Sequence, residues 1–174
     1  MVASPRTGIA VLAAVAVASL AAAQTARDGG QPENTMSKPS KEFISPKTLI
    51  APGPAGYSHI AKVNRGTIVY LSGQVPSDAS GKLTGEGDFE AQVEQVFANL
   101  KIAVEAAGGT MADIVKLNYY LVAEVDQASV PKLRPIRDRY LNVEKPPAST
   151  FLVVSRLARP GWLIEIEAVA AIDN

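Results

Sequence analysis

The stretch PPASTFLVVSRLARPGWLIEIEAVA, residues 146–170, decides the fold of this chain. It holds two runs, residues 148–156 and 162–170, that are rich in the β-branched and aromatic side chains typical of β-strands. Pro160 and Gly161 lie between the runs, and such a pair between two strand-like segments indicates a turn. The sequence therefore predicts two consecutive strands near the end of the chain.

The second run separates its side chains into two faces, because successive side chains of a strand point in opposite directions. One face is apolar and belongs on a core; it consists of Ile164, Ile166, Ala168 and Ala170. The other face carries Glu165 and Glu167, whose backbone positions lie roughly 7 Å apart at ~3.3 Å per residue. A carboxylate on a strand built for burial must be hydrated, paired or used chemically. This pair is the strongest chemical feature of the sequence.

Composition excludes several classes of function. The chain has 174 residues, one domain's worth, and its 17 basic residues balance 17 acidic ones, so no overall field favours nucleic acid or an anionic membrane. Without cysteine it can form no disulfide, thiolate metal site or cysteine nucleophile. His59 is the only histidine, which argues against a histidine metal site or a Ser-His-Asp triad.

The first 23 residues are interpreted as a signal peptide. Arg6 supplies a positive charge, an uncharged run rich in alanine and valine follows, and Ala21-Ala22-Ala23 fits a cleavage site before Gln24. A membrane anchor is the alternative, but the run is short and mostly alanine. The protein is thus expected to be exported, to the periplasm or outside the cell, with no membrane segment in its mature form. If Met36 is the true start, the protein is instead cytoplasmic.

Residues 24–45 are polar and rich in proline and glycine, and we interpret them as a flexible linker to a domain at 46–174. Strands are predicted at 57–63 and 67–72, joined as a hairpin by Asn64-Arg65-Gly66, with a short edge strand at 48–50. The residues at 88–107 predict a helix, because apolar side chains recur at helical spacing between Asp88 and Gly108.

A further strand is predicted at 114–123, followed by a helical segment at about 127–141. Pro131 and Pro135 lie inside that segment, so the helix is expected to be kinked or to begin late. Tyr119, Tyr120 and Trp162 are interpreted as core or interface aromatic residues. The order of elements predicts an α+β fold with one mixed sheet and both helices on one face.

Several segments resemble the reactive-intermediate deaminase (Rid, or YjgF-like) family of small enamine and imine deaminases. They are GTIVYLSGQVP at 66–76, GKLTGEG at 81–87, QVEQVFANLKIAVEAAG at 92–108, DIVKLNYYL at 113–121 and the stretch 146–170. The resemblance implies a chorismate-mutase-like fold and a homotrimer with clefts between subunits. It also implies hydrolysis of 2-imino or 2-enamino acids to 2-keto acids and ammonia, without cofactor or metal.

The same resemblance implies roles for particular residues. Tyr57 matches a tyrosine of the family's cleft, and Ser72 and Gly73 match a Ser-Gly wall. Glu167 matches the acidic residue that positions or polarises the attacking water. Glu165 is expected to be an ion-pair partner at the subunit surface instead.

Three positions depart from the family pattern. Ser149 stands where deaminating members have an arginine that holds the substrate carboxylate. Pro131 stands at the position of a cleft asparagine, and Phe151 at a position that is often cysteine. Losing a charge-assisted hydrogen bond in a desolvated cleft costs ~1.5–3 kcal/mol, so Ser149 cannot replace the arginine electrostatically. Other arginines could supply a substitute, but spacing alone places none of them; they are Arg134, Arg137, Arg156 and Arg159.

Two functions follow from these observations. The first is a trimeric hydrolase of a small imine, enamine or related C=N compound, one that need not carry a carboxylate. The second is a trimer without catalytic activity that binds a small metabolite or a partner protein in the same cleft. Tyr57, Ser72 and Glu167 favour the enzyme, whereas the three departures favour the binding protein.

Overall fold

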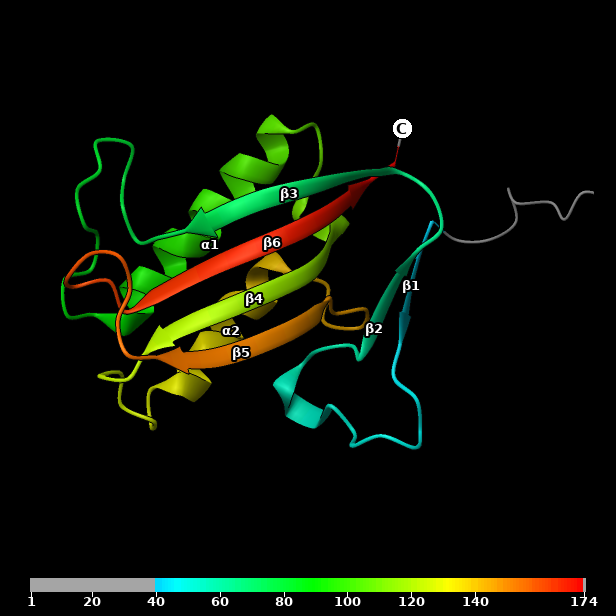
Figure 1. Cartoon of the computed structure of the whole chain (residues 1–174), viewed down its shortest axis with the longest axis horizontal. Helices are drawn as coiled ribbons and strands as arrows, with labels where there is room; N and C mark the ends of the chain where they lie inside the picture. The colour runs from blue at the N-terminus through cyan, green and yellow to red at the C-terminus, as the bar shows by residue number, and fades with distance from the viewer. Residues whose placement is uncertain (1–39, 174) are drawn as a thin grey trace, which may run out of the picture. The chain divides into compact units, whose positions relative to one another are not determined.

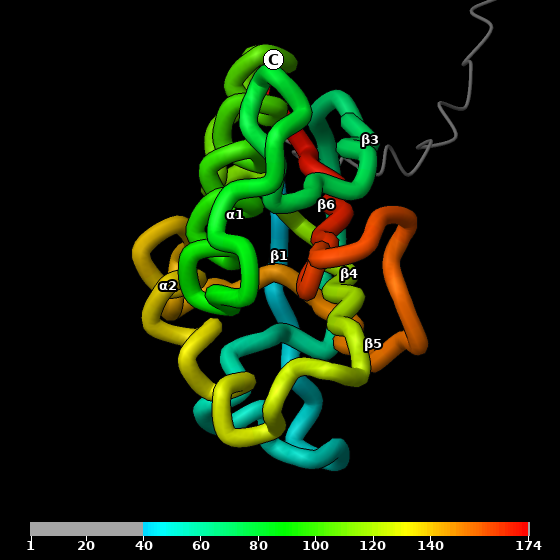
Figure 2. Tube along the Cα trace, turned by 90° about the vertical axis from the view of Figure 1, so that its left-hand side faces the viewer, coloured from blue at the N-terminus to red at the C-terminus, as the bar shows by residue number. Residues whose placement is uncertain are grey.

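A computed structural model describes residues 40–173. Its centre is a four-stranded sheet in the order β3-β6-β4-β5 (Figure 1). The strands are β3 (Thr67–Gln74), β6 (Ile164–Ile172), β4 (Ile114–Val122) and β5 (Ala148–Val154). β4 runs parallel to β5, and the other pairs are antiparallel. Helices α1 (Phe89–Ala106) and α2 (Leu133–Tyr140) lie on one face of this sheet (Figure 2). The predicted α+β fold class is therefore confirmed.

β6 forms the middle of the sheet, and its alternation follows the sequence pattern. Ile164, Ile166 and Ala170 are fully buried on the side of the helices, and Ala168 is almost so. The core that they join includes the apolar face of α1, namely Val93, Val96, Phe97, Leu100 and Val104. Glu165 and Glu167 lie on the opposite face of the sheet, which within residues 40–173 carries no helix. The strand thus separates a packed face from a face that carries its charges.

The predicted helix at 88–107 is confirmed as α1, and both of its ends are fixed by local hydrogen bonds. The Asp88 carboxylate accepts a hydrogen bond from the Ala91 amide at 3.1 Å, which makes it the N-cap. At the other end, the amide of Gly108 donates to the Glu105 carbonyl, and the amide of Gly109 to the Val104 carbonyl. Gly108 has φ 85°, a left-handed conformation that glycine adopts without strain.

The second predicted helix begins later than residue 127. A 3-10 turn, Val130–Lys132, precedes α2, which starts only at Leu133. Pro131 and Pro135 lie at or before the first turn of α2, where a missing amide donor costs little. The expectation of a late start is therefore confirmed.

The predicted hairpin between 57–63 and 67–72 is wrong. β2 (Ile60–Val63) pairs with β1 (Lys41–Ile44) in a separate two-stranded sheet, whereas β3 pairs with β6. The turn residues 64–66 join these strands without pairing them with each other. β3 carries Leu71 into the core, so its partner is the buried β6 and not β2, in which no residue is buried.

Two other predictions for the N-terminal part need correction. Lys41–Ile44 falls inside the predicted linker 24–45 but forms β1, held by pairing with β2 and by an ion pair between Lys41 and Asp113. The expected edge strand at 48–50 is a turn. The predicted signal peptide, 1–23, and linker residues 24–39 lie outside the described residues. Within residues 40–173, no helix has the length and apolar character needed to cross a membrane.

Candidate functional site

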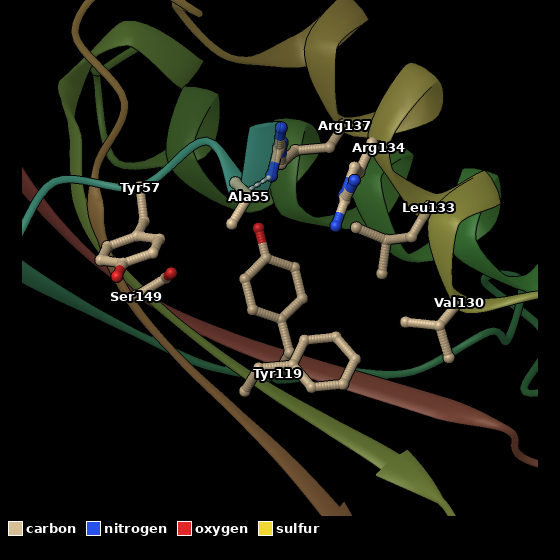
Figure 3. A pocket seen from close by; sticks show the side chains of 9 residues that line it. Ala55, Tyr57, Tyr119, Val130, Leu133, Arg134, Arg137 and Ser149 are labelled. Atoms are coloured by element: carbon tan, nitrogen blue, oxygen red, sulfur yellow. Dashed lines mark hydrogen bonds between the residues drawn. The ribbon is translucent and has the colours of Figure 1, made fainter. Parts of the chain in front are cut away.

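A cavity of about 280 Å³ lies between the β5 edge of the sheet and helix α2 (Figure 3). This volume is near the lower end of small-molecule sites, which span ~300–1,000 Å³. It is lined by Ala55, Tyr57, Tyr119, Val130, Leu133, Arg134, Arg137, Ser149 and Phe151. Three of the residues predicted for the site, Tyr57, Ser149 and Phe151, thus share one cavity.

Strand register and one loop bring these three residues together. β5 is parallel to β4, with Ser149 beside Leu117 and Phe151 beside Tyr119, so both side chains face the helices. The loop after the 3-10 turn Gly53–Ala55 runs along the start of β5, where the Ser58 amide donates to the Pro147 carbonyl at 3.1 Å. This contact holds the neighbouring Tyr57 at the cavity beside Ser149 (Figure 3).

The two arginines of the cavity differ in their partners. The guanidinium of Arg137 is buried; it donates to the Asp138 carboxylate at 2.9 and 2.7 Å and to the Ala55 carbonyl at 2.7 Å. A Cβ at Gly56 would come within 2.4 Å of it, so the loop packs directly on this group. Arg134 is exposed and has no hydrogen bond or ion pair with any residue in 40–173. Arg137 therefore anchors the loop, and Arg134 is available to a ligand.

Tyr119 contributes a second group that lacks a partner. Its side chain is 4 % exposed and stacks on Phe151 with ring centroids 5.7 Å apart. Its hydroxyl points into the cavity toward the α2 side and has no hydrogen-bond partner among residues 40–173 (Figure 3). Burial raises the pKa of this hydroxyl far above its usual value, so it stays protonated at neutral pH. Sequence patterning predicts only a packing role for Tyr119, because the position of its hydroxyl depends on the alignment of β4 with β5.

The acidic pair lies on the other face of the sheet. Glu167 accepts hydrogen bonds from the Asn118 amide and, at 3.0 Å, from the Tyr120 hydroxyl, both on the adjacent β4. Ser72 and Gly73 lie in an irregularity of β3, where the pairing with β6 shifts between Leu71 and Gln74.

Glu165 lies against that irregularity. A Cβ at Gly73 would come 2.0 Å from the Glu165 Oε1, so only glycine lets the carboxylate occupy this place. Glu165 has no hydrogen bond or ion pair within residues 40–173, and the ion pair predicted for it at the subunit surface stays a prediction. Burial, together with the negative charge of Glu167, raises the pKa of Glu165.

Replacing Glu165 with glutamine is expected to raise the melting temperature at pH 7 slightly. When burial raises the folded-state pKa of an acid, the charged form of that acid destabilises the fold. This destabilisation develops as pH rises from the unfolded-state pKa to the folded-state pKa, and it disappears in more acidic solution. The difference in melting temperature between Glu165→Gln and the unaltered protein should thus shrink toward zero below about pH 4, the usual range of a glutamate. A variant that is less stable at pH 7 would contradict this account.

The predicted site residues therefore fall into two groups on opposite faces of one sheet. Tyr57, Ser149 and Phe151 line the cavity on the helix side, whereas Ser72, Gly73 and Glu167 lie with Glu165 on the other face. Pro131 is exposed in the 3-10 turn and does not line the cavity, although its neighbour Val130 does. No metal or cofactor was expected, and residues 40–173 contain no cluster of three or more His, Cys, Asp or Glu side chains placed to hold a metal ion.

Comparison with known proteins agrees with the fold and with the motifs. The sequence model of the family described as Endoribonuclease L-PSP matches residues 49–172. The RutC family protein PH0854 of Pyrococcus horikoshii is 36% identical over 121 residues, which cover 69% of this chain and 90% of that protein.

Solved structures give the same result. The crystal structure of YyfB from Yersinia pestis, a protein of the conserved Rid family, has a TM-score of 0.71 and 36% identity and covers 77% of this chain and all of that one. The crystal structure of TdcF from E. coli, with bound serine, has a TM-score of 0.52 and 26% identity over 61% of this chain and 81% of that one. The chain belongs to the Rid/YjgF family.

Proposed function

We propose that the protein is a hydrolytic deaminase of small reactive imines or enamines and that it acts as a homotrimer. In this assembly the cavity of one subunit faces the acidic face of the next. The observation that carries the proposal is the division of the site: cavity and carboxylates lie on opposite faces of one sheet, so a second copy is needed to join them. Relatives in the Rid/YjgF family support such an assembly.

The side chains on the face opposite the helices also favour association. Ile68, Tyr70 and Leu152 are 41%, 81% and 47% exposed on strands whose other side is packed. Apolar side chains gathered on one face of a sheet typically mark a contact surface. A neighbour covering this face would also exclude water from Glu165 and Glu167, which strengthens their interactions with substrate.

The chemistry needs a group that exchanges protons. Water adds to the carbon of a protonated C=N bond and loses one proton, which gives a carbinolamine. The carbinolamine nitrogen gains a proton, and the C–N bond then breaks while the hydroxyl loses its proton, to give a carbonyl compound and ammonia. A carboxylate of raised pKa can accept the first proton and donate the second. Glu165 has this property, and its position against Gly73 leaves its oxygens without protein donors within residues 40–173.

Glu167 is suited to a complementary role. Asn118 and Tyr120 both donate to its Oε1, which fixes the direction of the carboxylate and leaves Oε2 without a donor from residues 40–173. We assign Glu167 to positioning the attacking water, as the resemblance implied, and Glu165 to proton exchange. Bound serine in TdcF supports a ligand of small amino-acid size for this chain.

The second candidate function is a trimer that binds a metabolite without turning it over. Ser149 in place of arginine favours it. An endoribonuclease, as in the description of the family model, finds less support, because the balanced net charge gives no overall attraction for a polyanion.

The deciding experiment measures release of 2-keto acid from 2-aminoacrylate, generated in situ by a pyridoxal-phosphate dehydratase, with and without the purified protein. Acceleration above the uncatalysed rate is expected, together with the mass of a trimer in analytical ultracentrifugation. A folded trimer that accelerates neither this reaction nor hydrolysis of a panel of neutral imines would replace the enzyme with the binding protein. A stable monomer with full activity would overturn the shared site.

Gly73→Ala is expected to lower turnover tenfold or more with little change in stability. The added methyl group would overlap the Glu165 carboxylate and displace it, while the flexible end of that side chain can move away. Steady-state kinetics and thermal unfolding measure the two effects. Gly81→Ala is the control for turnover only, because its surroundings are open but its φ of 82° makes alanine unfavourable there. Unchanged turnover in Gly73→Ala would argue against a role for Glu165 in this position.

A further inference from the structure

We propose that the cavity beside α2 binds a carboxylate through Arg134, Tyr119 and Ser149, so that a helix supplies the guanidinium missing at position 149. The inference rests on the proposed function for the identity of the substrate, which would then be a 2-imino or 2-enamino acid. The binding site itself is argued from the side chains of the cavity.

The charges of the cavity favour an anion. Its lining contains two guanidinium groups and no carboxylate. Arg137 is neutralised by Asp138 and directed toward the Ala55 carbonyl, so it contributes little to a ligand. The charge of Arg134 has no counter-ion within residues 40–173 and remains for a bound anion.

The hydroxyl of Tyr119 is an independent sign of a ligand. Buried polar groups almost always have a hydrogen-bond partner, because losing water without replacement is unfavourable. The Tyr119 side chain is 4 % exposed, and its hydroxyl, which opens into the cavity, is protonated at neutral pH and without a partner in the described part of the chain. Figure 3 shows it directed toward α2, into the part of the cavity where the guanidinium groups of Arg137 and Arg134 both lie. A ligand oxygen placed there could accept from both groups.

Ser149 completes a set of donors. Its side chain lines the same cavity from β5, and its hydroxyl has no hydrogen bond within residues 40–173. A planar guanidinium and two hydroxyls suit a carboxylate, which accepts hydrogen bonds on both oxygens. The rest of the lining is largely apolar, with Val130, Leu133 and Phe151 able to contact the remainder of a small ligand.

Calorimetric titration with pyruvate, a 2-keto acid of the product class, tests this site without turnover. The unaltered protein should bind pyruvate, and Arg134→Gln should weaken binding about ten- to a hundredfold, the range for loss of a charge-assisted hydrogen bond. Arg134→Lys should restore part of it. Arg156→Gln removes the same charge from an exposed position outside the cavity and should bind normally. Tyr119→Phe should weaken binding while it keeps the ring against Phe151.

Pyruvamide, which lacks the negative charge, separates charge recognition from a general loss of the cavity. Its binding should be the same in Arg134→Gln as in the unaltered protein. Three results would each overturn the inference. They are equal pyruvate affinity in Arg134→Gln and the unaltered protein, equal loss of pyruvate and pyruvamide binding in Arg134→Gln, and no pyruvate binding by the unaltered protein. Binding that depends on Arg134 in a protein without deaminase activity would sustain it and refute only the proposed function. Turnover of 2-aminoacrylate that is the same in Arg134→Gln as in the unaltered protein would sustain the proposed function and refute this inference.

Discussion

Glu165→Gln is expected to lower deamination of a small imine by about a hundredfold or more, the usual contribution of general acid–base catalysis. Glutamine keeps the size of the side chain and its place against Gly73 but can neither accept nor donate the required proton. The trimer should persist, because the substitution removes a charge that burial and Glu167 disfavour. Steady-state kinetics with ultracentrifugation measures both quantities, and the loss should appear mainly in kcat.

Glu167→Gln is the matched control on the same face of the same strand. It removes an equal charge, but it also disturbs the hydrogen bonds from Asn118 and Tyr120. If Glu167 positions water and Glu165 moves protons, only Glu165→Gln should abolish the pH dependence of kcat in the acidic range. Full activity of Glu165→Gln beside an inactive Glu167→Gln would assign the proton-transfer role to Glu167 instead.

Local patterns predicted the elements of the main sheet and α1 well. The alternation of β6 and the apolar period of α1 extend over several residues, and the buried side chains follow both. The pairing of β2 could not be predicted from such local patterns. Asn64-Arg65-Gly66 indicates a turn, but the partner strand β1 lies inside a polar segment that by composition looks unstructured. Strand pairing depends on the whole sheet, and a turn sequence reports only its own residues.

The candidate site was predictable only in part, for a related reason. Resemblance grouped Tyr57, Ser149 and Phe151 with other residues, and these three line one cavity. Arg134 could not be chosen among four arginines, because its place depends on how α2 packs against β5. Glu165 and Glu167 share a face and a residue type, so strand alternation does not distinguish them, and only the resemblance assigns them different roles. Contacts from neighbouring strands distinguish them in the structure.

Gln92→Leu is expected to destabilise the folded protein by about 2–4 kcal/mol, since each buried polar group left without a partner costs about 1–3 kcal/mol. Gln92 is fully buried in α1. Its amide donates to the carbonyls of Gly85 and Gly161 at 2.9 and 2.8 Å, and its oxygen accepts from the Leu163 amide at 2.8 Å. Leucine fills a similar volume, so the loss comes from the hydrogen bonds and not from a cavity.

The partners of Gln92 differ in what they lose. The Gly85 carbonyl keeps the Asp88 amide, whereas Gly161 and Leu163 lose the contact that fixes the turn leading into β6. Unfolding in urea at matched protein concentration measures the change, with Gln95→Leu as control because its amide bonds only to Asn99 on the same helix. A Gln92→Leu variant whose free energy of unfolding lies within about 1 kcal/mol of that of the Gln95→Leu control, a difference inside the range of an ordinary single hydrogen bond, would contradict the prediction.

Because β6 begins one residue after Leu163, we also expect Gln92→Leu to loosen the strand that presents Glu165 and Glu167 and to lower turnover even where the protein remains folded.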